Sequence, residues 1–339
     1  MIDSESLFAS ARSQLLQQIE AVTPATFGET ALSVFRWQAE HNPVYRSFLH
    51  HLGVKPEQIA SPEAIPCLPI SFFKTHSLQT GTWTPQTVFR SSGTTGTTTS
   101  RHPVRDTAFY ERNAQRGFEA VYGPLSQYTV LALLPAYLER SDSSLVFMAD
   151  YFIRQSTDSS SGFFLHDYDQ LATVLRQCAR EQKPTLLLGV SFALWDMAER
   201  YQLGFEELVV METGGMKGRR KELTRAELHA ILAPAFRQKQ IHSEYGMTEL
   251  LSQAYSPGEG RFYPAPTMRV CIRDMTDPLT LQKDGRTGAI NVIDLANLDT
   301  VSFIATDDLG RRYADGSFEV LGRLDAADIR GCNLLTLDG

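Results

Sequence analysis

Short apolar runs alternate with segments of helical periodicity through the middle of this 339-residue chain, and no other feature restricts its fold as strongly. The runs predict strands, and the intervening segments, with apolar residues three and four positions apart, predict helices. The expected strands are 87–90, 130–134, 185–189 and 207–211, and the expected helices are 106–121, 167–180 and 191–201. This alternation indicates an α/β architecture, in which ligand-binding loops lie at strand ends.

The two ends of the chain have different patterns. Residues 1–60 are predicted to form a helical segment, and Pro62, Pro66 and Pro69 follow it in a connector. From about residue 260 the pattern changes to strands and turns. The strands expected there are 268–272, 289–295, 301–305 and 318–321.

Charge, hydropathy and cysteine usage exclude several classes of protein. A net charge of −7 argues against a general nucleic-acid or anionic-membrane surface. No stretch approaches the roughly 18 apolar residues of a membrane span, and the first residues, MIDSESLFAS, lack the features of a signal peptide. Cys67, Cys178, Cys271 and Cys332 form no CxxC pair, so we expect free thiols in a cytoplasmic protein.

A loop rich in glycine and hydroxyl groups, SSGTTGTTTS, occupies residues 91–100 directly after the first predicted strand. Gly93 and Gly96 allow successive backbone N–H groups to point inward as an anion-binding nest. Ser92, Thr94 and Thr95 add hydroxyl donors, so the loop suits a polyphosphate. It is not a Walker A loop, because GxxxxGK[ST] is absent. The alternative interpretation is a Ser/Thr linker or a hairpin tip.

Four segments, in this order, resemble the signature motifs of the adenylate-forming superfamily of acyl-CoA synthetases, luciferases and peptide-synthetase adenylation domains. They are SSGTTG at 91–96, YGMTE at 245–249, TDD at 306–308 and GRLD at 322–325. The middle residue of TDD departs from the superfamily's TGD. Within the superfamily, the chain resembles the LuxE-type acyl-protein synthetases, which are related to phenylacetate–CoA ligases. The segments that carry this closer resemblance are 68–76, 134–140, 143–146, 212–218 and 330–334.

The resemblance implies a fold and a division of the chain. The expected fold is an α/β large domain like that of adenylate-forming enzymes, with mixed sheets flanked by helices. Residues 1–305 would form this domain, and residues 306–339 a truncated, β-rich C-terminal segment. A full mobile C-terminal domain is not expected, because relatives continue past GRxD whereas this sequence stops at Gly339.

The resemblance also implies which residues hold ATP. The phosphate loop would wrap the β- and γ-phosphates with Ser92, Gly93, Thr94, Thr95 and Gly96. Tyr245 would stack on adenine beside Gly246, and Gly214 and Gly215 would form a loop that faces adenine and the acyl chain. Asp308, or the aspartate before it, would bind the ribose hydroxyls. The plainer alternatives are polar turns, a strand-to-helix turn and a surface carboxylate.

The same resemblance assigns charged and polar residues to the reacting end of the nucleotide. Thr248 would lie beside the α-phosphate, and Glu249 would bind Mg²⁺, a hard cation that prefers oxygen ligands. Lys74 would neutralise phosphate or carboxylate charge, unless it is an ordinary exposed lysine. Arg323 lies at the hinge position of relatives and would help to close the site.

The final acyl acceptor is expected to be a cysteine. The resemblance places it at Cys332, where Arg330 would favour the thiolate and Gly331 would let a carbonyl approach. The alternative is a cysteine buried among neighbouring leucines. Cys178 lies on the apolar stripe of its helix and is predicted to be a packing residue.

These roles describe an acid–thiol ligase with two reaction steps. ATP and Mg²⁺ would convert a carboxylic acid, of the fatty-acid class, to acyl-AMP, and Cys332 would then take the acyl group as a thioester. An acyl reductase or another acyl-acceptor protein would receive it. The alternatives are a compact acyl-CoA ligase of the phenylacetate–CoA ligase type and a non-catalytic nucleotide-binding subunit.

Overall fold

A computed structural model describes residues 4–91, 98–134, 142–214, 220–221 and 223–324. The chain divides into two compact units. The first comprises Met1–Asn113, Glu249–Ser252 and Pro266–Gly339, and the second comprises Ala114–Thr248 and Gln253–Ala265. Helix α5 (Thr107–Tyr122) begins in the first unit and continues into the second.

A sheet forms the centre of the second unit. Its strands are β4 (Thr129–Leu133), β5 (Gly162–Phe164), β6 (Thr185–Val190), β7 (Leu208–Thr213), β8 (His242–Tyr245), β9 (Ala254–Ser256) and β10 (Arg261–Pro264). They follow the order β10-β9-β8-β7-β6-β4-β5, parallel from β8 to β5 and antiparallel for β9 and β10. Every residue of β4 and β6 is buried, as expected for parallel strands covered on both faces.

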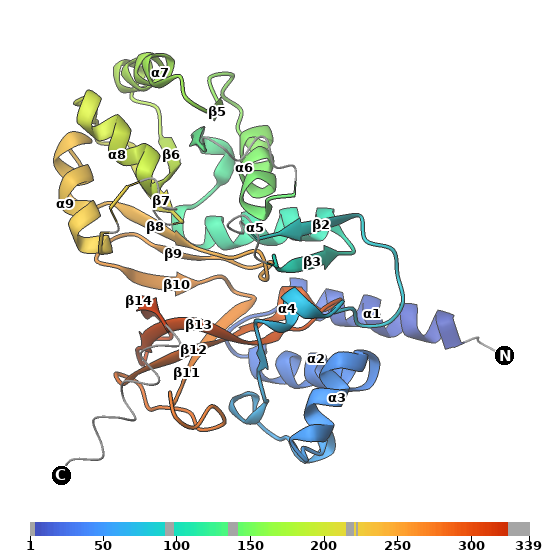
Figure 1. Cartoon of the computed structure of the whole chain (residues 1–339). Helices are drawn as coiled ribbons and strands as arrows, with labels where there is room; N and C mark the ends of the chain where they lie inside the picture. The colour runs from blue at the N-terminus through green and yellow to red at the C-terminus, as the bar shows by residue number, and fades with distance from the viewer. Residues whose placement is uncertain (1–3, 92–97, 135–141, 215–219, 222, 325–339) are drawn as a thin grey trace, which may run out of the picture. The chain divides into compact units, whose positions relative to one another are not determined.

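Four helices of this unit connect its parallel strands. They are α6 (Ser144–Gln155), α7 (Tyr168–Glu181), α8 (Ser191–Arg200) and α9 (Arg225–Ala235). Helix α6 follows β4, and α8 and α9 lie on the opposite face of the sheet, as right-handed crossovers require (Figure 1). The connections therefore change direction between β4 and β6, where open α/β sheets bind their ligands.

The first unit contains an antiparallel sheet of β11 (Met268–Arg273), β12 (Thr287–Asp294), β13 (Phe303–Arg312) and β14 (Phe318–Arg323). The short strand β1 (Leu68–Pro69) pairs in parallel with the first half of β13, whereas β14 pairs with its second half. Strands β2 (Thr87–Arg90) and β3 (Arg101–Val104) form a separate hairpin.

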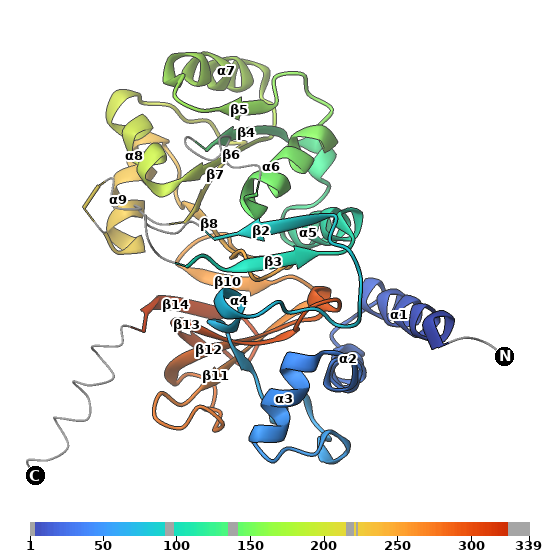
Figure 2. The ribbon, with the colours of Figure 1, turned by 45° about the vertical axis from the view of Figure 1, so that its right-hand side comes forward.

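The N-terminal helices are α1 (Ser4–Glu20), α2 (Phe27–His41) and α3 (Pro43–His51), and the single-turn helix α4 (Phe72–Thr75) follows β1 (Figure 2). Asn42 starts α3, because its side-chain oxygen accepts hydrogen bonds from two backbone N–H groups of the first turn. Phe35 of α2 and Tyr45 of α3 both contact the ring of Phe303 in β13, with centroids 5.9 and 6.1 Å away. These aromatic contacts hold the helices on the sheet.

The structure confirms the predicted mixed α/β fold and the helical N-terminal segment. All the strands and helices expected from the alternating pattern are present, with ends shifted by a few residues, whereas the short strands β5, β9 and β10 were not expected. The division at residue 305 stays a prediction, and residues 325–339 lie outside the described part. Within that part, no helix has the length and apolarity needed to cross a bilayer.

Candidate functional site

The predicted phosphate loop connects the two strands of the β2–β3 hairpin. Ser91 and Ser100 close its base: the Ser91 N–H donates to the Ser100 carbonyl at 3.2 Å, and the Ser100 N–H donates to Ser91 Oγ at 2.9 Å. Ser92, Gly93, Thr94, Thr95 and Gly96 lie outside the described residues. The base of the loop, at Ser91 and Ser100, belongs to the first unit.

Glu249, the predicted metal ligand, lies beside this base. Its side chain is buried, and burial raises the pKa of the carboxyl, whereas Ser100 and the positive charges of Arg323 and Lys74 act in the opposite direction. Ser100 Oγ is itself buried and has no hydrogen-bond partner of ordinary length among the described residues. Glu249 thus lies within electrostatic range of Arg323 and Lys74, two other residues that the sequence assigned to the reacting end of the nucleotide.

The strand pairing of β13 explains why Asp308 joins this group. The triplet 306–308 lies where the β1 pairing of β13 ends and its β14 pairing begins. Thr306 and Asp308 are buried and Asp307 is exposed, because successive residues of a strand point to opposite faces. The Arg323 Nε lies 3.4 Å from Asp308 Oδ1. Asp308, and not Asp307, therefore shares the site with Arg323.

Lys74 reaches the site because β1 fixes the position of α4. Leu68 pairs with Ile304, and the N–H of Ile70 donates to the carbonyl of Ala305 at 2.9 Å. The chain then turns into α4, whose Phe73 enters the core while Lys74 remains exposed. The predicted segment 68–76 thus carries a positive charge toward the 306–308 triplet.

The other side of α4 borders a groove. Phe72 and His76 stack with ring centroids 4.8 Å apart, and Phe48 of α3 faces Phe72 at 6.2 Å. The groove has a volume of about 460 Å³ and is lined by Pro43, Val44, Ser47, Phe48, His51, Phe72 and His76. The sequence assigned no role to this surface.

The second unit carries the other predicted nucleotide residues at the carboxyl ends of β7 and β8. Gly214 follows β7 with a φ of 68°, a left-handed conformation that favours glycine, and its carbonyl accepts a 2.7 Å hydrogen bond from Ser191 Oγ. Gly215 lies outside the described residues. Tyr245 ends β8, is buried, and packs against Phe262 with centroids 6.0 Å apart. Thr248 is the last residue of this unit before Glu249.

Two carboxylates lie at these strand ends. Glu212 of β7 is buried, which opposes ionisation, but His229 and Arg225 outweigh burial and lower its pKa. Glu244 of β8 accepts a 2.5 Å hydrogen bond from Thr213 Oγ1. Burial raises the pKa of Glu244 to about 7, the Thr213 hydrogen bond opposes this rise, and the charge of Glu212 adds to it. One carboxylate of the pair is therefore ionised at neutral pH and the other is close to half protonated.

The Glu244 carboxyl lies where a side chain at residue 246 would begin. A Cβ atom at residue 246 would lie 2.3 Å from Glu244 Oε1 and 3.5 Å from Gln253 Cγ, so the carboxyl group would have to move to admit it. The glycine predicted to contact the nucleotide thus has a second reason to be glycine. The Glu244 carboxyl group fills the space beside the Gly246 Cα atom.

The described cysteines are placed as packing residues or as thiols that resist ionisation. Burial raises the pKa of the Cys67 and Cys271 thiols, and Cys178 is buried on α7, as predicted for a packing residue. Because the thiolate is the nucleophilic form of cysteine, none of the three suits acyl transfer. Cys332 lies outside the described residues.

The described residues contain no cluster of three or more His, Cys, Asp or Glu that could enclose a metal ion. Mg²⁺ does not require one, because it is usually held by one or two carboxylates together with substrate phosphates. Glu249 provides a hard oxygen donor, and no described residue forms an ion pair with it. The residues therefore fit a magnesium–nucleotide complex.

Solved structures with the same fold define the class of protein. An open conformation of 2-hydroxyisobutyryl-CoA ligase in complex with 2-HIB-AMP and CoA aligns with a TM-score of 0.65 at 12% identity, covering 91% of this chain and 78% of the ligase. ATP-bound MatB from Rhodopseudomonas palustris aligns with a TM-score of 0.52 at 18% identity and covers 70% of this chain. This chain spans about half, 47%, of the MatB chain. The fold is that of adenylate-forming enzymes.

The family is narrower than the fold. The LuxE family of acyl-protein synthetases matches residues 14–338, and the chain therefore belongs to this family. A comparison with curated proteins gave no match.

Several buried or partly buried polar residues near the predicted site were given no role by the sequence reasoning. Glu244 directly precedes the YGMTE motif, and its signal was an acidic residue within a strand pattern. Ser100 belongs to the glycine- and hydroxyl-rich loop, and nothing in the composition of that loop marks the Ser100 hydroxyl as buried. Asp294 and Asn297 stand outside every motif, so only the fold reveals them.

Proposed function

We propose that this protein activates a carboxylic acid of the fatty-acid class with ATP and transfers the acyl group to Cys332. One observation carries the proposal. Glu249 lies beside Ser100 at the base of the glycine-rich hairpin loop, within range of the charges of Lys74 and Arg323, and Arg323 pairs with Asp308. A carboxylate for a metal–phosphate complex, a carboxylate for hydroxyl groups and cations for phosphate are the groups that ATP needs.

The reaction has two balanced steps. A carboxylate oxygen of the acid bonds to the α-phosphorus of ATP, while the bond from that phosphorus to pyrophosphate breaks. Acyl-AMP and pyrophosphate result. The Cys332 sulfur, having lost its proton to solvent, then bonds to the acyl carbon, and AMP leaves with the electrons of the broken C–O bond. Covalent catalysis in this form divides one difficult step into two easier ones.

The protein's own residues would bind and orient the reactants. Glu249 would hold Mg²⁺, which neutralises phosphate charge when bound. Lys74 and Arg323 would attract the acid and the phosphates to the buried end of the loop, and Asp308 would accept hydrogen bonds from the ribose. In the second unit, Tyr245 and the turn at Gly214 would contact adenine. Burial strengthens the interactions of Glu249 and Asp308, because little water competes for their charges, whereas Lys74 and Arg323 are exposed.

Two observations support Cys332 as the acyl acceptor. The LuxE family is a family of acyl-protein synthetases, and its match extends to residue 338. The other cysteines are buried or have a raised thiol pKa. The acyl group would then pass to a partner, such as an acyl reductase.

The test separates the two steps. Carboxylate-dependent exchange between ATP and labelled pyrophosphate reports the first step, and hydroxylamine-labile acyl label on the protein reports the second. Cys332→Ala should keep the exchange and lose the label, whereas Cys67→Ala should keep both. Equal labelling of Cys332→Ala and wild type would refute the acceptor assignment.

A compact acyl-CoA ligase is the second candidate, favoured by the fold shared with 2-hydroxyisobutyryl-CoA ligase. It requires that coenzyme A take the acyl group directly from acyl-AMP. Cys332→Ala would then form acyl-CoA at the wild-type rate. Nucleotide binding without exchange over a broad panel of acids would instead indicate a non-catalytic subunit.

A further inference from the structure

The segment Glu249–Ser252 belongs to the first unit although the chain on both sides of it belongs to the second. It is therefore held by side chains rather than by a continuous strand or helix. Its four residues are buried. The hydrogen bonds that fix the backbone of residues 249–252 therefore also fix the position from which the Glu249 side chain extends.

Asp294, at the end of β12, binds the second half of this segment. Its Oδ2 accepts from the N–H groups of Leu251 at 2.8 Å and Ser252 at 3.0 Å. Its Oδ1 accepts from Ser252 Oγ at 2.5 Å and from the N–H of Ala296 at 3.1 Å. The Asp294 side chain is fully buried, so these four donors replace all of its water.

Asn297, three residues further on, binds the first half. Its Nδ2 donates to the carbonyl of Glu249 at 2.8 Å and to that of Val301 at 3.3 Å. Two carbonyl partners fix the orientation of the amide, because a rotated amide would point its oxygen at both. This is a direct bond to the backbone of the proposed metal ligand.

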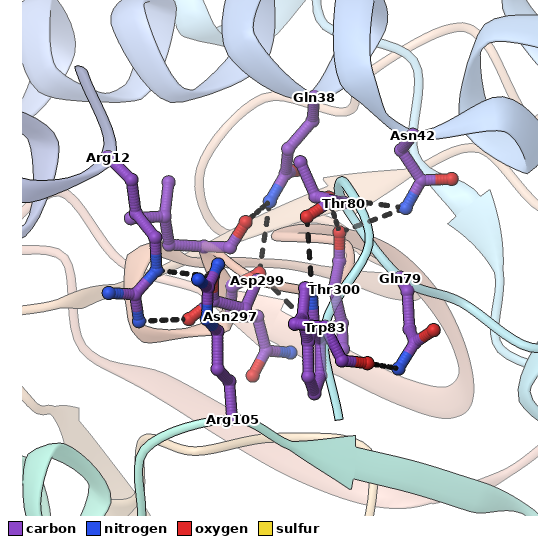
Figure 3. Close-up of polar contacts among 11 residues, drawn as sticks. Arg12, Gln38, Asn42, Gln79, Thr80, Trp83, Arg105, Asn297, Asp299 and Thr300 are labelled. Atoms are coloured by element: carbon purple, nitrogen blue, oxygen red, sulfur yellow. Dashed lines mark hydrogen bonds and ion pairs between the residues drawn. The ribbon is translucent and has the colours of Figure 1, made fainter. Parts of the chain in front are cut away.

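The residues that hold Asn297 are themselves tied to the N-terminal helices (Figure 3). Gln38 of α2 donates to the carbonyl of Asn297 at 3.0 Å. Asn42 donates to the carbonyl of Thr300 at 3.1 Å, and Arg12 of α1 forms a two-bond ion pair with Asp299 at 2.6 Å. Gln38 thus holds the Asn297 peptide directly, whereas Asn42 and Arg12 bind residues further along the turn.

We propose that Asp294 and Asn297 are positioning residues, which hold residues 249–252 so that the Glu249 carboxylate meets the metal-bound phosphates. The inference rests on the proposed function, because it assumes that Glu249 is the metal ligand. Neither residue contacts the nucleotide. They act through the backbone, and the energy of the buried hydrogen bonds maintains the geometry.

The test measures binding without turnover. ATP is titrated calorimetrically into protein without carboxylic acid, once with Mg²⁺ and once with EDTA. The readout is the ratio of the dissociation constant in EDTA to the dissociation constant in Mg²⁺, which measures how much the metal strengthens binding. In Asn297→Ala the ratio should fall at least tenfold from its wild-type value. Asn297→Asp keeps the side-chain volume but turns an oxygen toward the two carbonyls, so it should lose as much. Asp294→Asn should lose less, because its amide oxygen can keep the Leu251 and Ser252 bonds.

Asn42→Ala is the matched control. Asn42 is as deeply buried as Asn297, donates from Nδ2 to a backbone carbonyl in the same network, and does not touch residues 249–252. Its ratio should remain within twofold of wild type even though the fold is destabilised. Circular dichroism checks that each variant is folded.

Glu249→Gln separates the two levels of the inference. If it lowers the ratio while both Asn297 variants match wild type, the positioning role is wrong and the metal assignment stands. If Glu249→Gln leaves the ratio unchanged, the metal assignment fails and the positioning role fails with it. An equal loss in Asn42→Ala and Asn297→Ala would also overturn the positioning role.

Discussion

Replacement of Glu244 by glutamine should change how the stability of the protein depends on pH. The carboxyl has a pKa of about 7 in the folded protein, raised from 4.5 chiefly by burial. A raised carboxyl pKa means that the folded state favours the protonated form. The stabilisation is fully present below pH 4.5 and is lost as the pH rises through 7.

The size of the effect follows from the two pKa values. A difference between 4.5 and about 7 corresponds to roughly 3 kcal/mol between the protonated and the ionised limits. Part of Glu244 remains accessible to water, which screens the charge, so about 2 kcal/mol is the expected loss between pH 5 and pH 8. Glutamine keeps the shape and can still accept from Thr213, and it does not titrate.

Urea unfolding at pH 5, 6, 7 and 8 measures this difference. The free energy of unfolding of wild type, minus that of Glu244→Gln, should fall by about 2 kcal/mol across the series. Glu212 is present in both proteins, and the effect of its charge on Glu244 is part of the difference that is measured. A difference between wild type and Glu244→Gln that stays constant from pH 5 to 8 would refute the burial of a protonated carboxyl at this strand end.

Three further predictions concern other contacts. Arg12→Ala removes a two-bond ion pair with Asp299, and the two side chains are only 15% and 16% exposed. The free energy of unfolding in urea should therefore fall by about 2 kcal/mol. Arg154→Ala, which removes the half-exposed pair with Asp150, should lower it by at most about 0.5 kcal/mol. Gly246→Ala should destabilise the protein, because its Cβ would overlap Glu244 Oε1 unless the carboxyl group moves. Glu244→Ala in the same chain should restore part of the lost stability. Strictly additive effects of the two substitutions in a double-mutant cycle would contradict this. Asp308→Asn should weaken ATP binding about tenfold in calorimetry, whereas Asp307→Asn on the exposed face should not, and the reverse result would move the ribose contact to Asp307.

The sequence predicted the parts of the fold that have a strong periodic signal. The buried runs of β4 and β6 and the amphipathic helix α7 lie close to their expected positions, because burial on two faces or on one stripe leaves a clear pattern. Strands β9 and β10 have three and four residues with mixed polarity, and β10 ends in proline. Segments this short become strands because a neighbour pairs with them, and a local pattern cannot show that neighbour.

The candidate site divides in the same way. Motifs indicated Glu249, Lys74, Asp308 and Arg323, which all belong to the first unit, and their roles stay predictions. Motifs could not indicate Asp294 or Asn297, since buried polar residues are chosen by partners that lie far away in the chain. The predicted roles of Ser92, Gly93, Thr94, Thr95, Gly96, Gly215 and Cys332 stay predictions, because these residues lie outside the described part.

The path of the chain limits how this protein can be dissected. The backbone passes from one unit to the other four times, after residues 113, 248, 252 and 265. One of these passages divides YGMTE itself, so that a single peptide bond joins Thr248 to Glu249 across the boundary. A fragment cut at 114 and 265 would keep Glu249 but lose the Asp294 and Asn297 contacts that orient it. An exchange of residues 114–265 between relatives would therefore also exchange Glu249–Ser252, four residues that belong to the first unit.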